Sequence, residues 1–107
     1  MSLDVYLTAV RPTEVYSRNI THNLNKMAEA AGIYMHLWRP EEIGIEKAEQ
    51  LIAPLTEGLE KLKAEPEHYK QFNAPNGWGM YEHFVPFVED YLEACVGNPD
   101  AEVRAHR

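Results

Sequence analysis

The sequence predicts an α+β domain in which a small, mainly antiparallel sheet is covered by three to four helices. Residues 3–9 alternate between apolar and polar side chains, a pattern that is typical of a half-buried strand. Apolar residues then recur at helical spacing through most of residues 24–96, and alternation returns at 101–106. An N-terminal strand or hairpin and a C-terminal strand therefore enclose a helical middle, which indicates the α+β class.

The opening strand is followed by signals for a hairpin. The sequence "RPT" at 11–13 predicts a turn, because Pro12 cannot donate a hydrogen bond to a strand ladder. Residues 14–17 then predict a second short strand. The apolar face of the opening strand carries Leu3, Val5, Leu7 and Ala9.

The first helical stripe ends at Gly32, which is a natural C-cap. Residues 33–38 predict a further helical turn, and Pro40 suits the first position of the next one. The stripe itself consists of Leu24, Met27, Ala28 and Ala31.

Residues 46–63 predict the longest helix, with a kink or break at Pro54. Pro66 opens a short segment, and "NAPNGWG" at 73–79 has the composition of a turn. A last helix is predicted from about 80 to 96, kinked at Pro86 and capped by Gly97. Its inward residues are predicted to be Tyr81, Phe84, Val85, Val88, Tyr91, Leu92 and Cys95.

The overall composition restricts the class of protein. The chain has 107 residues, which suits a single globular domain over 1–107. Ten basic and 17 acidic residues give a net charge of −7, which argues against nucleic acid and anionic membranes as partners. The sequence shows neither a signal-peptide pattern nor a membrane-spanning run, so a cytoplasmic protein is expected. A homo-oligomer is compatible with this composition.

Cysteine and histidine usage gives no sign of redox or metal chemistry. Cys95 is the only cysteine and falls on an apolar stripe, so we interpret it as a small buried hydrophobe. The five histidines are dispersed and form no close pair of the kind that zinc sites use. We therefore expect neither a metal site nor a cofactor.

The segment "NITHNLN" at 19–25 is the first candidate binding site. Asn19 or Thr21 can cap the helix that follows, which leaves His22 and Asn23 as additional polar groups in its first turn. Such a helix start can bind an anion or a polar ligand. The alternative is a cap together with a histidine that ties the helix to the sheet.

The segment "LWRP" at 37–40 is the second candidate. Trp38 offers a flat apolar face, and Arg39 offers a planar fork of donors for a carboxylate or phosphate. The alternative is that Trp38 packs in the core while Arg39 pairs with a surface glutamate.

The segment "NGWGMYEH" at 76–83 is the third candidate. Trp78 between two glycines could stack on a ligand, with Tyr81 and Glu82 directly behind it. The alternative is a tight turn that Trp78 anchors.

Four stretches resemble a family of small proteins from bacteria and their phages. They are "NITHNLNKMAEAAGIY", "LWRPEEIGI", "FNAPNGWGMYEHFVPFVEDYLEAC" and "NPDAEVRAHR", which together cover nearly the whole chain. The family has no established activity, catalytic residue or cofactor, so the resemblance carries no site over. It implies a cytosolic accessory protein with a connection to phages.

Three functions follow as hypotheses. The first is non-enzymatic binding of a small polar or anionic ligand by the three candidate segments together. The second is a protein-interaction or phage counter-defence module, an inhibitor or a sponge, whose acidic surface meets a basic partner. The third is a small hydrolase or lyase that uses His22 and Glu82 as acid and base. The binding hypothesis requires residues 19–23, 38–39 and 76–82 to line one cleft.

Overall fold

A computed structural model of the chain describes residues 2–8 and 14–107. It contains a three-stranded sheet formed by β1 (Ser2–Thr8), β2 (Glu14–Thr21) and β3 (Glu102–His106). The strand order is β2-β1-β3, and β1 runs antiparallel to both of its neighbours. The predicted α+β class and its antiparallel sheet are therefore confirmed.

The central strand β1 buries one face, as its alternating sequence predicts. Leu3, Val5 and Leu7 are fully buried, whereas the residues between them are half-buried on the opposite face. One-sided burial of this kind requires a second layer against the apolar face. The predicted turn at 11–13 and Ala9 lie outside the described residues.

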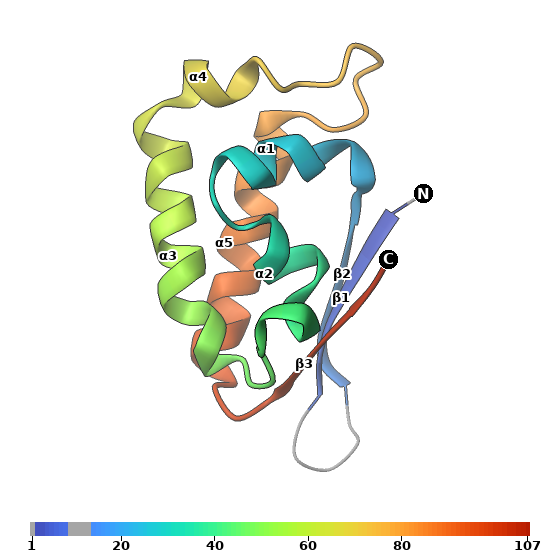
Figure 1. The fold of residues 1–107 in the computed structure, drawn as a ribbon, viewed down its shortest axis with the longest axis vertical. Coiled ribbons are helices and arrows are strands. Elements are labelled where there is room, and N and C mark those ends of the chain that lie inside the picture. Colours follow the sequence, from blue (N-terminus) through green and yellow to red (C-terminus); the bar gives the residue numbers. More distant parts are fainter. Residues whose placement is uncertain (1, 9–13) are drawn as a thin grey trace.

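Helices supply that second layer, and Figure 1 shows them together on one side of the sheet. The two long helices α3 and α5 pack against each other. In the described part of the chain, no helix has the length and the apolar run that crossing a bilayer would require.

The described residues form five α-helices and two 3-10 helices, where the sequence predicts three to four helices. In chain order these are η1 (His22–Leu24), α1 (Asn25–Ala30), α2 (Tyr34–Trp38), η2 (Pro40–Ile43), α3 (Glu49–Ala64), α4 (Pro66–Lys70) and α5 (Tyr81–Gly97).

The larger number arises because the chain between 22 and 43 is divided into short pieces. Gly32 has φ +80° and ends α1, as predicted. Its N–H donates to Glu29 O at 3.0 Å, and the N–H of Ile33 donates to Ala28 O at 2.9 Å. These two hydrogen bonds form a helix C-cap around a left-handed residue, and they redirect the chain into α2.

The second strand is longer than predicted, and this corrects the first candidate segment. β2 continues to Thr21, so Asn19 and Thr21 belong to the sheet and His22 begins a 3-10 helix of three residues. The difference arises because Ile20 pairs with Leu3 on the buried face of the sheet. The alternation of the strand thus extends through residues 19–21, whose polar sequence is typical of a helix N-cap.

The sequence predicts a kink or a break at Pro54, and the helix is not broken there. The kinks at Pro54 and Pro86 stay predictions. α3 begins at Glu49 and continues through Pro54, and α5 continues through Pro86 without ending. In α5 the carbonyl that loses its partner to Pro86 belongs to the exposed Glu82, where water can bond to it. Gly97 is helical, and Asn98 is the C-cap in its place, with its amide N–H donating to Ala94 O at 3.0 Å.

The core contains the predicted apolar stripes together with large aromatic side chains. Of the residues predicted to face inward from α5, Phe84, Val88 and Tyr91 are fully buried, whereas Tyr81, Val85 and Leu92 are only partly buried. Phe87, which is not among the predicted residues, is also buried. Cys95 is buried among them, as predicted. The core also contains Trp38, which is only 1% exposed.

We expect Gly58→Ala to lower the free energy of unfolding. An added Cβ at Gly58 would lie 2.6 Å from Ile33 Cγ2, so it would overpack the buried contact between α3 and the start of α2. Overpacking of this kind typically costs about 1–3 kcal/mol. Urea unfolding followed by circular dichroism measures the change.

Gly97→Ala is the matched control for this substitution. A Cβ at Gly97 meets no described heavy atom within 4 Å, so the gain in helix propensity, about 0.5–1 kcal/mol, is unopposed. A Gly58→Ala protein at least as stable as the wild type would contradict the packing described here.

Cys95 is expected to be unreactive while the protein is folded. Burial raises the pKa of its thiol to about 12, so the nucleophilic thiolate is scarce near neutral pH. Alkylation by iodoacetamide, followed by mass spectrometry, should be slow in native buffer and fast in urea. Equal rates in the two solvents would show that the thiol is accessible in the native state.

Candidate functional site

A polar cleft lies where the end of β2 meets the loop between α4 and α5. Figure 1 shows this loop passing over the start of α1 at one end of the molecule. The cleft has a volume of about 1150 Å³. It is lined by Ser2, Asn19, Ile20, Thr21, His22, Asn23, Leu24, Asn76, Gly77, Trp78, Gly79 and His83.

The β2 side of the polar cleft is fixed by hydrogen bonds of its own side chains. Asn19 donates from Nδ2 to Ser2 Oγ at 2.8 Å and to Asp4 Oδ1 at 2.7 Å, which ties β2 to β1. Thr21 Oγ1 accepts from the backbone N–H of Asn23 at 3.2 Å and so caps η1. Of the two predicted caps, Thr21 is therefore the one that forms.

Asn23 joins the two sides of the cleft. Its Nδ2 donates to the carbonyl oxygen of Trp78 at 2.7 Å. Gly79 lies so close that an added Cβ would be 2.8 Å from Asn23 Cβ, and its φ of +115° also favours glycine. Asn76 Oδ1 accepts from the N–H of Trp78 at 3.0 Å, which holds the tip of the loop. Trp78 is thereby anchored through its backbone.

The indole of Trp78 is the most exposed large apolar side chain of the cleft. It is 70% exposed, although both the N–H and the carbonyl of the residue are hydrogen-bonded. The hydrogen-bonded backbone thus places an exposed aromatic ring beside the cleft.

His22 connects the cleft to the core. Trp38 donates from Nε1 to His22 Nδ1 at 3.4 Å, and the two rings meet edge to face. Because Nδ1 accepts a hydrogen bond, the neutral ring carries its proton on Nε2. That Nε2 is shielded from solvent and has no hydrogen-bond partner among the described residues. Leaving such a group unpaired typically costs about 1–3 kcal/mol.

The second candidate segment does not line the polar cleft. Trp38 lies in the core and stacks on Tyr34 at a centroid distance of 5.4 Å. Arg39 pairs with Glu42 at 2.6 Å and donates to the Tyr34 hydroxyl at 3.4 Å. The alternative for this segment, a core Trp38 and an Arg39 paired with a surface glutamate, therefore describes the structure. Trp38 can stack on Tyr34 because residues four apart share one face of a helix.

The third segment lies only partly in the cleft. Trp78 lines it, whereas Tyr81 donates its hydroxyl to Leu62 O at 2.7 Å, and Glu82 is exposed on the first turn of α5 outside the lining. His83 lines the cleft instead. Successive residues of a helix point about 100° apart around its axis, so Glu82 and His83 face different directions. The sequence alone gives no reason to prefer His83 over Glu82, because the face that α5 turns to the cleft depends on tertiary packing.

The lining of the cleft has no lysine or arginine that could pair with an anion, so the anion-binding interpretation gains no support from it. No Asp or Glu belongs to the lining either. The helices η1 and α1 have three and six residues, too short for a helix dipole to attract an anion strongly, and Thr21 already occupies the N–H of Asn23. Within residues 2–8 and 14–107, no three His, Cys, Asp or Glu side chains gather to hold a metal ion.

No family model, no curated protein and no solved structure matches the chain. The resemblance to phage and bacterial proteins therefore stays a prediction from its sequence motifs.

We expect Asn23→Ala to loosen the loop over the cleft while the fold persists. The substitution removes the hydrogen bond to the Trp78 carbonyl, at a typical net cost of about 0.5–1.5 kcal/mol. The backbone amides of Gly77 and Trp78 should then exchange with solvent faster, while those in α5 keep their rates. Amide hydrogen exchange followed by NMR measures both.

His83→Ala is the control for this experiment. His83 lines the same cleft but is exposed, and its side chain makes no hydrogen bond to a described residue. Amide hydrogen exchange at Gly77 and Trp78 should be unaffected by loss of the His83 side chain. An Asn23→Ala protein with wild-type exchange at both loop amides would show that Asn23 does not anchor the loop.

Proposed function

We propose that the polar cleft binds a small, uncharged, polar ligand with a ring that stacks on Trp78, and that it does so without catalysis. The observation that carries the proposal is that four polar side chains of the lining are held by internal hydrogen bonds and keep a further polar group for a ligand; they are Asn19, Thr21, Asn23 and Asn76. This combination of fixed side chains and spare groups reduces the entropic cost of binding.

The spare groups can be named. Asn19 and Asn23 use their amide N–H groups internally, which leaves the Oδ1 atoms as acceptors. Asn76 uses Oδ1 and keeps its amide N–H groups as donors, and the Thr21 hydroxyl accepts once and keeps its proton to donate. Neutral donors and acceptors side by side suit hydroxyl or amide groups, each of which needs both.

The aromatic surface of Trp78 favours a ligand with one apolar ring face. Ligand sites typically combine such a surface with a few fixed polar groups that set orientation. Because the lining has no lysine or arginine and the whole chain has a net charge of −7, a neutral ligand is favoured over a phosphate or a carboxylate.

The enzymatic hypothesis has less support. A general acid and base must reach the same substrate, and Glu82 does not belong to the lining that contains His22. Binding without catalysis is therefore preferred. The interaction or counter-defence hypothesis does not depend on this cleft.

The proposal can be tested by thermal unfolding with a panel of neutral sugars and nucleosides, alongside their phosphates. A ligand at about 100 times its Kd stabilises the folded state by about 2.7 kcal/mol, which is a measurable shift in Tm. We expect a shift with a neutral compound and a smaller one with its phosphate. Tryptophan fluorescence should change in parallel, because Trp78 is the exposed one of the two indoles.

Trp78→Ala should abolish the shift, and Val96→Ala is the matched control. Val96 is also an exposed apolar residue, 58% exposed, but lies outside the lining. If no neutral compound stabilises the wild type, or if Trp78→Ala keeps the full shift, the proposal is wrong.

A further inference from the structure

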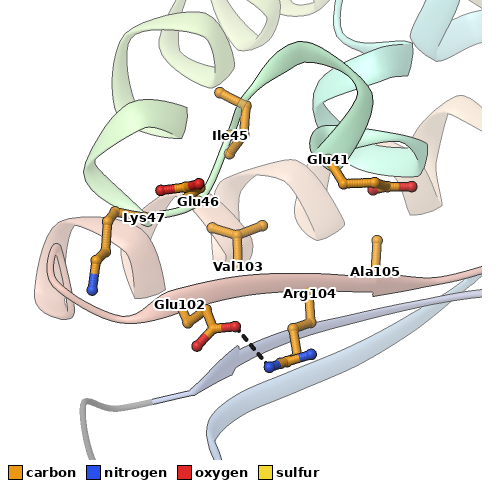
Figure 2. Close-up of a pocket in the computed structure, with 8 residues that line it drawn as sticks. All are labelled: Glu41, Ile45, Glu46, Lys47, Glu102, Val103, Arg104 and Ala105. Atoms are coloured by element: carbon orange, nitrogen blue, oxygen red, sulfur yellow. Dashed lines mark ion pairs between the residues drawn. The ribbon is translucent and has the colours of Figure 1, made fainter.

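Besides the polar cleft, a concave surface of about 600 Å³ lies between β3 and the chain that connects η2 to α3. Figure 2 shows its lining, in which Arg104 pairs with Glu102 at 2.7 Å. Arg107 pairs with Glu41, and Lys47 offsets the remaining carboxylate of the lining. This surface therefore has no surplus charge that would select a ligand. A chemically reactive pair of residues lies in the wall of the polar cleft instead.

Asn76 is the only asparagine of the sequence that directly precedes a glycine. The backbone nitrogen of the next residue can attack an asparagine amide, and asparagine is among the thermolabile residues. A side chain on that next residue hinders the attack, and glycine has none. Both Asn76 and Gly77 are exposed, and an added Cβ at Gly77 would meet no described heavy atom within 4 Å. Water and base therefore reach this peptide bond freely.

The hydrogen bond of the Asn76 side chain prepares it for this attack. Asn76 Oδ1 accepts from the backbone N–H of Trp78 at 3.0 Å. This bond closes a ring that contains both Asn76 Cγ and the nitrogen of Gly77, so the electrophile and the nucleophile are held in one turn. When the nitrogen adds to Cγ, negative charge develops on Oδ1, and a backbone donor at this distance stabilises it.

The nucleophile is restrained by one exposed hydrogen bond. The N–H of Gly77 donates to Ala74 O at 3.1 Å and has to leave that bond before it can react. Because Gly77 is exposed, water can replace Ala74 O as its partner when the turn opens. Such a local opening needs less free energy than unfolding of the domain. The bond between Asn76 and Trp78 spans only two residues, so it can persist while the turn opens.

We propose that Asn76–Gly77 is a modification site at which the folded chain deamidates itself, and that the product binds the ligand of the polar cleft more weakly. A base takes the N–H proton of Gly77, the nitrogen bonds to Asn76 Cγ, and the side-chain NH₂ takes up a proton and leaves as ammonia. Water then adds to either carbonyl of the cyclic imide and breaks the C–N bond of that carbonyl. The product is aspartate, or isoaspartate, whose backbone runs through Cβ. Water is the only co-reactant, and no group is oxidised or reduced.

The product changes the polar cleft in two ways. Residue 76 loses the amide N–H groups that the proposed function uses as donors, and a carboxylate appears in a lining that has no lysine or arginine to pair with it. In isoaspartate the backbone also gains one bond, which displaces the N–H of Trp78 from its acceptor. This effect on binding rests on the proposed function, whereas the deamidation does not.

The first test incubates the full chain in mildly alkaline buffer and follows it by tandem mass spectrometry. We expect residue 76 to gain the mass that separates OH from NH₂, with release of an equal amount of ammonia. Asn73 is the internal control, because its Oδ1 also accepts from a backbone N–H, that of Tyr81 at 2.7 Å, but alanine follows it in the sequence. Asn76 should react many times faster than Asn73. Equal rates at the two residues would overturn the proposal.

Two variants test the mechanism. Asn76→Gln keeps an amide at the same place but requires a larger ring for the attack, so the mass gain at residue 76 should be lost. Gly58→Ala separates local from global opening, because it destabilises the domain at a contact with Ile33, outside the loop. Its rate should equal that of the wild type. A rate that rises with the unfolded fraction, in this variant or in the wild type in low urea, would show that the reaction requires unfolding and would overturn the proposal.

The effect on the cleft is measured with Asn76→Asp, which reproduces one of the two products. A neutral compound that raises the Tm of the wild type should raise the Tm of this variant, and of the incubated wild type, by less. An equal shift would overturn the effect on binding alone. If no compound of the panel stabilises the wild type, the proposed function and the effect on binding both fail. The mass measurement then still decides whether Asn76 deamidates.

Discussion

One-sided burial of the central strand β1 is the constraint on which the other elements depend. Its apolar side chains are fully buried, and β1 pairs with both of the other strands. The covering layer is reached in steps, since α5 contacts β2, α2 contacts β3, and α3 packs against α5. An ion pair between Arg18 of β2 and Asp90 of α5 adds a polar link at the margin of this contact. Polar side chains consequently lie on the opposite face of β1 and at the ends of the strands.

The proposed binding surface lies at such an end of the sheet. The polar cleft forms where β2 ends and the chain leaves the sheet. A single side chain from a neighbouring element contributes to its shape, because Asn23 holds the loop over the cleft.

The strands and the principal helical stripes could be predicted because they depend on periodicity, which is a local property of the sequence. Pro54 does not end its helix, because the local cost of a lost hydrogen bond is outweighed by the apolar stripe on either side. Tyr34 and Trp38 are one helical turn apart and stack in the structure. This four-residue spacing of two aromatic residues indicates a shared helix face, and so favours a packed Trp38 over an exposed one. The contact between Asn23 and Trp78 joins residues 55 positions apart, and no periodicity in a single sequence specifies such a pair.

Most of the polar residues in "NITHNLN" have a role in folding, so their presence alone does not indicate a ligand. Asn19 bridges two strands, Thr21 caps η1, His22 accepts from Trp38, and Asn23 anchors the loop. Trp78 is different. The carbonyl that Asn23 holds is common to every amino acid, and an indole that is 70% exposed gains little from burial. The backbone contacts explain where residue 78 lies but not why it is a tryptophan, and a ligand that stacks on the ring would supply that reason.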